Sequence, residues 1–303
     1  MFDLLVLWAW EYDADFIALL QRSAEKAQIH IKCLGPVEAA QVGPQLASGT
    51  LQARALLDRV WDEGGDYERH IDVARKCIPH LLNDFDLVRQ AWHKPSIHYR
   101  LIAHGLHAPH MLVLPSVKEH STLAVPDLTP LGPRFSIKSV NSGGSGVLKP
   151  GTTWQDVLTR RMEWPHEQTL LQRWVEPQIM GAQRAWFRLF YACGSTFVCW
   201  QDDLTHEQVP VTPAEEARYG LGILRGMMQQ IAGLCGLNLF STEIALDVQG
   251  QWQVIDYVND PCDYRLKSSV KNGVPDEIVQ TICDRIVAWA SKLKMANFDF
   301  SRL

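Results

Sequence analysis

The chain has 303 residues, of which 47% are hydrophobic and 21% are charged, and its formal net charge is −5. This length and composition predict a globular protein with a large core and exclude a disordered chain. Because the net charge is slightly negative, we expect no nucleic-acid partner.

The N-terminal part of the sequence predicts a small, mostly parallel sheet. An apolar run at residues 2–9 indicates a buried strand, which is too short to cross a membrane and has no basic segment before it. Apolar positions at helical spacing follow at residues 12–26, and a second apolar segment occupies residues 29–34. Strand, helix and strand at this spacing indicate a βαβ unit. We expect further helices at residues 39–60 and 67–77, interrupted by glycines.

The cysteines indicate a reducing environment. The seven cysteines are scattered, their number is odd, and no Cys-x-x-Cys pair or zinc-type spacing occurs. This pattern predicts free thiols. No targeting segment is visible either, so we expect a cytoplasmic protein with no membrane partner.

Prolines mark a linker in the middle of the chain. The stretch from Pro115 to Pro133 contains four prolines, both ends included. We therefore expect one α/β domain at residues 1–115 and a second domain at residues 116–303.

Helices are predicted at three places in the second domain. The first covers residues 152–162 and is capped by a threonine at 152 or 153. The clearest covers residues 213–236, with Thr212 as N-cap and a proline in the first turn. The last covers residues 275–292.

A lysine precedes a glycine-rich loop. Lys138 lies in the apolar segment 135–140, and Gly143, Gly144, Ser145 and Gly146 follow it. Glycines let backbone N–H groups approach phosphate oxygens closely, and the lysine can neutralise phosphate charge. The same loop is also compatible with an ordinary hairpin, so its meaning depends on what lies downstream.

A second motif downstream supports a phosphate ligand. Residues 241–247 and 252–261 alternate as two strands around a glycine turn and predict a hairpin. Glu243 on the first strand and Asp256 and Asn259 on the second offer oxygen ligands for a hard cation. Mg²⁺ with a nucleotide, or Mn²⁺ in its place, suits this set. Polar ends of an exposed hairpin are the alternative.

Together these motifs resemble the ATP-grasp superfamily, which includes D-alanine ligase, glutathione synthetase and biotin carboxylase. The resemblance covers about residues 75–290 and includes motif order. It implies an α/β (α+β) chain with the ATP-grasp fold, in which a βαβ domain precedes two lobes that sandwich the nucleotide.

The resemblance assigns nucleotide-binding residues. Lys94, before the segment Gly105–Pro109, matches the first nucleotide lysine, and Lys138 matches the second. The segment 170–177 is similar to the strand whose backbone reads the adenine edge. It gives Gln172, Arg173 and Val175 as adenine contacts and Glu176 as a ribose ligand.

The resemblance also suggests catalytic and acceptor residues. Arg188 falls where the family has an arginine facing phosphate or the acyl phosphate, with Arg184 as a competitor. The polar segment after the hairpin would border the acceptor substrate. Its candidates for gripping a carboxylate or phosphate are Arg265, Lys267 and Ser268, although a solvated loop would also explain this segment.

One departure from the family concerns the metal site. The family has acid-x-Asn, whereas this chain has Tyr257-Val258-Asn259. Asp256 shares the face of Asn259 only if a β-bulge intervenes, and Asp260 or Asp263 could substitute for it.

Histidines are concentrated between residues 93 and 110. They are His93, His98, His104, His107 and His110. A zinc site is one interpretation of this cluster, but the spacing does not match that of a zinc-binding helix. They are therefore predicted as surface and helix-end residues.

The expected function is an ATP-dependent ligase that joins a small carboxylate to an amine or thiol through an acyl phosphate. Two alternatives stay open: an ATP-grasp phosphotransferase and a non-catalytic ATP-binding protein. Many relatives are dimers, so a homodimer is one option that the sequence does not decide.

Overall fold

The computed structural model describes residues 1–64, 68–141 and 150–296. Two compact units form, each from separate stretches of sequence. The first comprises Met1–Val88, Arg188–Ser241 and Asp260–Leu303, and the second comprises Arg89–Phe187 and Thr242–Asn259. The expected division between residues 115 and 116 stays a prediction. Gly143, Gly144, Ser145 and Gly146 lie outside the described residues.

A four-stranded parallel sheet forms the first unit's centre. Its strands are β1 (Phe2–Trp8), β2 (Ile31–Leu34), β3 (Ala53–Arg59) and β4 (His80–Leu82), in the order β2-β1-β3-β4. The two strands predicted near the N-terminus are confirmed, and the parallel pairing of β1 with β2 confirms the βαβ unit.

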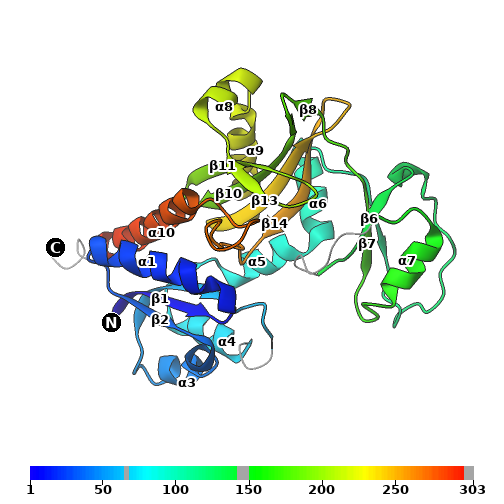
Figure 1. The fold of residues 1–303 in the computed structure, drawn as a ribbon. Coiled ribbons are helices and arrows are strands. Elements are labelled where there is room, and N and C mark those ends of the chain that lie inside the picture. Colours follow the sequence, from blue (N-terminus) through cyan, green and yellow to red (C-terminus); the bar gives the residue numbers. More distant parts are fainter. Residues whose placement is uncertain (65–67, 142–149, 297–303) are drawn as a thin grey trace. The chain divides into compact units, whose positions relative to one another are not determined.

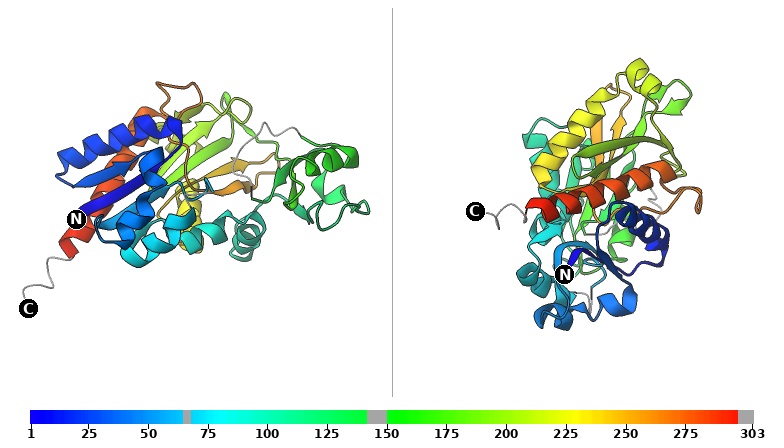
Figure 2. Two further views of the ribbon diagram at one scale, coloured as in Figure 1. Left: turned by 90° about the horizontal axis from the view of Figure 1, so that it is seen from below. Right: turned by 90° about the vertical axis from the view of Figure 1, so that its left-hand side faces the viewer.

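Helices cover one face of this sheet. Leu4 and Val6 of β1 join a core with α1 (Ala14–Lys26) and the long C-terminal helix α10 (Asp276–Ala296). The two helices pack against each other, as Figures 1 and 2 show. The helices predicted over residues 12–26 and 275–292 are thus confirmed, the second with a longer C-terminal end.

The other face of the sheet is also buried. Leu5 and Leu7 of β1 join a second core with residues from α2 (Pro36–Ala39), α3 (Val42–Ala47) and α4 (Glu68–Cys77). A strand buried on both faces has a continuous apolar sequence instead of an alternating one.

That property explains one wrong prediction. Residues 39–60 were expected to be helical, but β3 occupies residues 53–59 between β1 and β4. Its residues Ala55 and Leu57 face one core, and Leu56 faces the other. A short apolar run of this kind cannot be distinguished from a buried helix by periodicity alone. The helix expected at residues 67–77 is confirmed as α4.

In the second unit, a three-stranded antiparallel sheet carries Lys138. The strands are β5 (Met111–Leu114), β6 (Phe135–Ser139) and β7 (Thr169–Arg173), in the order β5-β7-β6. One face packs against α7 (Trp154–Arg161). The helix expected here is confirmed, and Thr153 caps it by accepting the backbone N–H of Asp156.

A five-stranded sheet contains the predicted hairpin. In order it consists of β12 (Gln208–Pro210), β11 (Ser195–Gln201), β10 (Trp186–Ala192), β13 (Leu239–Leu246) and β14 (Trp252–Asn259). Because β13 and β14 are neighbours in the sheet and joined by a short turn, the hairpin prediction is confirmed. A separate ribbon pairs β8 (Ile179–Met180) with β9 (Gln183–Arg184).

The helix expected over residues 213–236 is divided in two. α8 (Pro213–Tyr219) begins at the predicted N-cap Thr212 and ends at Gly220, which has a φ of 66°. α9 (Gly222–Cys235) then starts anew. Glycine adopts this left-handed conformation without a steric cost, so it ends α8 inside an otherwise helical pattern.

The remaining elements are short. They are α5 (Phe85–Trp92), α6 (Lys94–Ala103) and the 3-10 helices η1 (Glu11–Asp13) and η3 (Thr129–Leu131). Within residues 115–133, all of which are described, η3 is the regular element, in agreement with a linker. Among the helices of the described ranges, none has both the length and the hydropathy needed to span a membrane.

Candidate functional site

The strand pairing of β6 and β7 places Lys138 on the sheet face opposite α7. Phe135 and Ile137 point into the core with α7, so the alternating residues Ser136 and Lys138 lie on the other face. The Lys138 Nζ donates a hydrogen bond to Oε1 of Gln172, at 3.1 Å. Gln172 supplies a neutral acceptor, which leaves the positive charge of Lys138 uncompensated by this contact.

Gly151, the second described residue after the glycine-rich segment, pairs with the strand that precedes that segment. Gly151 pairs with Phe135, with hydrogen bonds of 3.1 and 2.8 Å between their backbones. A Cβ at Gly151 would lie 2.6 Å from Ile137 Cδ1, so a larger residue there would require the buried side chain of Ile137 to shift. The described chain after the glycine-rich segment therefore lies beside the strand of Lys138.

Lys94 lies near Lys138. It is the first residue of α6, and its side chain is half-buried. Burial lowers the pKa of Lys94 and nearby Lys138 lowers it further, whereas the Asp256 and Glu167 carboxylates oppose this shift. Two lysines close enough to affect each other form a site that an anion stabilises.

Gln172 lies at the centre of a buried hydrogen-bond network. Besides accepting from Lys138, it donates through Nε2 to the Ile255 carbonyl at 3.1 Å and to the Tyr257 hydroxyl at 3.0 Å. The Tyr257 hydroxyl in turn lies 2.6 Å from His98 Nδ1. Because this hydroxyl accepts from Gln172, it can donate its own hydrogen to His98.

Burial favours the neutral forms of His98 and Tyr257. It lowers the pKa of His98 to about 4 and raises the pKa of Tyr257 well above the ordinary range. His98 is 3% exposed and Tyr257 is 2% exposed. The expectation that the histidines are surface or helix-end residues is therefore wrong for His98, because the face of α6 that carries it packs against β14.

Sequence reasoning missed Tyr257 and His98 as site residues. Tyr257 occupies the position at which the family's acid is expected, yet its hydroxyl contacts His98 and Gln172. The replacement of the acid by tyrosine was visible in the sequence. Its partner was not visible, because His98 is distant along the chain and only the fold brings α6 to β14.

The predicted metal ligands lie on β13 and β14. Glu243 accepts a hydrogen bond from Trp186 Nε1 at 3.2 Å. Asp256 and Asn259 are half-buried, whereas Tyr257 and Val258 between them are buried. Two carboxylates and an amide are hard oxygen donors that fit Mg²⁺, which keeps several waters and takes few protein ligands. The described residues contain no group of three or more His, Cys, Asp or Glu suited to a metal ion. The assignment of these ligands stays a prediction.

The alternative acids have other surroundings. Asp263 forms an ion pair with Arg265, whose guanidinium lies 2.7 Å from the carboxylate. Asp260 is 7% exposed, and burial raises its pKa to about 7.

The two candidate arginines differ in their partners. Arg188 on β10 donates to Ser241 Oγ at 2.8 Å. Arg184 lies 2.9 Å from a carboxylate oxygen of Glu176, the predicted ribose ligand. The charge of Arg184 is thereby balanced, and the phosphate role of Arg188 stays a prediction.

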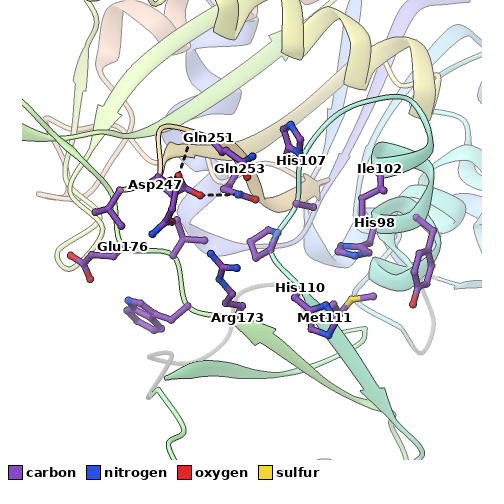
Figure 3. Close-up of a pocket in the computed structure, with 17 residues that line it drawn as sticks. His98, Ile102, His107, His110, Met111, Arg173, Glu176, Asp247, Gln251 and Gln253 are labelled. Carbon is purple, nitrogen blue, oxygen red and sulfur yellow. Dashed lines mark hydrogen bonds between the residues drawn. The ribbon is translucent and has the colours of Figure 1, made fainter. Parts of the chain in front are cut away.

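The predicted adenine contacts separate into two environments. Arg173, Val175 and Glu176 line a cavity of about 560 Å³ in the second unit, whereas Gln172 belongs to the buried network with Lys138 (Figure 3). Val175 also packs against Ala245 in a small apolar cluster. The structure thus places these four residues along one connected segment but directs their side chains differently.

The predicted acceptor residues have contacts within the first unit. Arg265 pairs with Asp263 and lies over the ring of Trp10. Lys267 donates to the Gln208 carbonyl, and the Ser268 backbone N–H donates to Asp276. Their role in substrate binding stays a prediction.

A nucleophilic role is unfavourable for Cys193 and Cys199. Burial raises the pKa of Cys193 and that of Cys199, each to about 12. A neutral thiol is a poor nucleophile, so these two side chains are unsuited to nucleophilic chemistry.

A second buried polar cluster, also missed from the sequence, lies at the carboxyl end of β3. Arg59 donates to both carboxylate oxygens of Asp13, and Asp58 lies 2.7 Å from His70 Nε2. All four of these side chains are buried. Only the parallel sheet brings them together at one edge.

Structural comparison identifies the fold. The chain is similar to D-alanine–D-alanine ligase from Bacillus anthracis in complex with ATP, with a TM-score of 0.68, 12% identity, and coverage of 98% of this chain and 100% of the other. It is also similar to a RimK domain ATP-grasp protein from Sphaerobacter thermophilus, with a TM-score of 0.65, 16% identity, and coverage of 93% and 98%.

A third similar structure is the ATP-grasp ligase PsnB complexed with its minimal precursor, Mg and ADP. Its TM-score is 0.63, with 12% identity and coverage of 95% of this chain and 98% of the other. No protein-family model matches the chain, and no curated protein matches it. The similarity over nearly the whole chain confirms the expected α/β ATP-grasp fold.

Proposed function

We propose that this chain, which has the ATP-grasp fold, is an ATP- and Mg²⁺-dependent ligase that joins a small carboxylate to an amine or thiol through an acyl phosphate. The observation that carries the proposal is the grouping of Lys94, Lys138 and Asp256, of which Lys138 lies on the strand that precedes the glycine-rich segment in the sequence. Cations of this kind suit the phosphates of a nucleotide.

The proposed chemistry is charge neutralisation and positioning. Lys94, Lys138 and Arg188 would contact the phosphates, while Glu243, Asp256 and Asn259 would hold Mg²⁺. When bound, Mg²⁺ supplies Lewis-acid stabilisation of phosphoryl charge. Phosphoryl transfer to the substrate carboxylate gives the acyl phosphate and ADP, and attack by the amine nitrogen or thiol sulfur then releases phosphate. Arg265, Lys267 and Ser268 are proposed to border the acceptor.

The hydrogen-bond network has a positioning role in this proposal. Tyr257 holds the Nε2 of Gln172, so the Oε1 of Gln172 points to Lys138. Because Gln172 is neutral, it does not compensate the positive charge of Lys138, which stays available to a phosphate. A lysine side chain that is already held in place loses less conformational entropy when a phosphate binds.

One observation favours a second candidate, a nucleotide-binding protein without catalysis. Tyr257 stands where an acid is expected and is buried against His98. A Mg²⁺ site would then require Asp256 in place of that acid, with a bulge in β14 that puts Asp256 and Asn259 on the same face of the strand.

Magnesium-dependent ADP release in the presence of pools of amino acids and small carboxylates tests the proposal. We expect ADP formation that needs both a carboxylate and an amine or thiol and that is lost in Glu243→Gln. Glu163→Gln, which changes an exposed glutamate paired with Arg160, is the matched control and should keep full activity. ADP formation with a hydroxyl acceptor and no condensed product would indicate a phosphotransferase. Nucleotide binding without turnover in any pool would favour the non-catalytic alternative.

A further inference from the structure

Glu243, a predicted metal ligand, has a hydrogen-bond donor on the neighbouring strand. Trp186 is the first residue of β10, and Glu243 lies in the middle of β13, which is adjacent to β10 in the five-stranded sheet (Figure 1). The indole Nε1 of Trp186 donates to Oε2 of Glu243 at 3.2 Å. Both residues belong to the second unit, and both are half-buried. The proposed phosphate chemistry gives this indole no role.

Apolar packing holds the Trp186 ring in place. The ring packs against a buried cluster that consists of Val175, Ala245 and Ile255. Ala245 follows Glu243 by two residues on β13, so the two side chains lie on the same face of the sheet, against which the indole packs. A tryptophan side chain has only two torsions. A ring that is packed in this way therefore points its N–H group in a fixed direction.

The Glu243 carboxylate benefits from a fixed donor because its side chain is long. The backbone is already held, since Thr242 Oγ1 donates to the Asp256 carbonyl at 2.8 Å and ties β13 to β14 beside both predicted acidic ligands. A glutamate side chain nevertheless has rotational freedom that it loses when it coordinates a cation. A carboxylate has about four lone-pair sites, so an N–H group and a cation can share it. A donor on Oε2 thus orients the carboxylate and is compatible with coordination.

We propose that Trp186 is a positioning residue that orients the Glu243 carboxylate for Mg²⁺ and thereby sets how strongly Mg²⁺ increases the affinity for the nucleotide. This inference rests on the proposed function, because it takes Glu243 as a ligand of nucleotide-bound Mg²⁺. The indole acts through Glu243 and is not itself a ligand, since its N–H group can only donate. Hydrogen-bond partners of metal ligands typically contribute roughly 10- to 100-fold to metal affinity.

Titration calorimetry with a non-hydrolysable ATP analogue, with and without Mg²⁺, tests this role in Trp186→Phe. Phenylalanine keeps an aromatic ring and removes the donor. We expect the Mg²⁺-dependent increase in affinity to be smaller by roughly tenfold than in the unchanged chain. The affinity measured without Mg²⁺ should stay the same, whereas a merely structural role of the ring would lower the affinity under both conditions.

Trp252→Phe is the matched control. Trp252 is a half-buried tryptophan on β14 of the same sheet, and its ring contacts Phe187. Its indole nitrogen forms no hydrogen bond with any residue of the described ranges. The effect of Mg²⁺ on affinity should therefore be the same in Trp252→Phe as in the unchanged chain.

NMR of the unchanged chain tests the same geometry even if Trp186→Phe does not fold. Mn²⁺ is added in place of Mg²⁺ together with the ATP analogue, and the indole N–H resonances are assigned by triple-resonance spectra. A paramagnetic ion broadens resonances with a steep dependence on distance. Because the Trp186 N–H group contacts Glu243, its resonance should broaden at lower Mn²⁺ concentrations than that of Trp252.

Two kinds of result would overturn this inference. An equal effect of Mg²⁺ in Trp186→Phe and the unchanged chain, an equal loss of affinity with and without Mg²⁺, or no greater broadening of Trp186 than of Trp252 would overturn the positioning role alone. Analogue binding by the unchanged chain that does not respond to Mg²⁺ would overturn the proposed function together with it.

Discussion

Each unit contains a buried polar network. The network of the first unit consists of paired charges, whereas that of the second unit consists mainly of neutral groups. In the first unit, Arg59 and Asp13 form a closed ion pair, with both side chains 2% exposed. In the second unit, neutral groups link His98 to Lys138, and Lys138 forms no ion pair among the described residues. The first network compensates its charge internally, whereas the second leaves one positive charge for a ligand. We therefore expect the first to act on stability and the second on binding.

Breaking the closed pair should have the largest effect. Arg59→Met leaves the Asp13 carboxylate buried without its partner and should lower the free energy of unfolding by about 3–5 kcal/mol. Urea denaturation measures this loss. The double variant Asp13→Leu with Arg59→Met should recover much of it. Arg160→Met, which breaks an exposed pair with Glu163, is the control. An equal decrease in the free energy of unfolding in Arg59→Met and Arg160→Met would contradict the stabilising role of the buried pair.

Removing the uncompensated charge should instead affect the reaction. Lys138→Met should reduce kcat/KM for ATP by about 30- to 1000-fold, equivalent to roughly 2–4 kcal/mol of transition-state stabilisation. ADP release and urea denaturation, measured on the same samples, separate activity from stability. Lys118→Met, an exposed lysine of the same unit, is the control. Unchanged turnover in Lys138→Met would contradict the role of this lysine.

The neutral state of the second network predicts a pH dependence. Burial lowers the pKa of His98 from 6.5 to about 4, so between these values the unfolded chain binds more protons than the native chain. Stability should therefore decrease as the pH falls from about 6.5 to about 4, by an amount on the order of 2–3 kcal/mol. Urea denaturation across this pH range measures it.

The matched variant for this dependence is His98→Asn. Its amide oxygen can still accept from the Tyr257 hydroxyl, but it does not titrate. We expect a shallower loss of stability in the acid range than in the unchanged chain. Equal slopes in the two proteins would show that His98 is not buried in its neutral form.

The smallest effect should come from the central hydroxyl. Tyr257→Phe removes one partner of Gln172, whose Nε2 keeps its bond to the Ile255 carbonyl. We expect a loss of about 1 kcal/mol in the free energy of unfolding and a modest decrease in ATP affinity, because Lys138 loses part of its support. Tyr99→Phe, at an exposed tyrosine of α6, should change neither. A larger loss from Tyr99→Phe than from Tyr257→Phe would contradict the network.

Local sequence signals predicted much of the fold. The first two strands, the β13–β14 hairpin and the caps at Thr153 and Thr212 depend on short-range patterns, and the structure confirms them. The strand at residues 53–59 was not predicted, because burial on both faces removes its alternation.

The site was predicted unevenly for a similar physical reason. Lys138 could be proposed as a site residue because its strand and the following glycines are adjacent in the sequence. The roles of His98 and Tyr257 depend on α6 packing against β14, a contact between distant segments. The expectation that Gln172 contacts adenine did not foresee that its side chain bonds to Lys138 and Tyr257.

Equilibrium binding of a non-hydrolysable ATP analogue tests the central claim most directly, namely that Lys94 and Lys138 hold the phosphates of a nucleotide. Titration calorimetry would compare the unchanged chain, Lys94→Met and Lys138→Met, with and without Mg²⁺. The account predicts magnesium-enhanced binding that each substitution weakens about tenfold or more. Equal affinity in all three proteins, or no binding by the folded, unchanged chain, would contradict it.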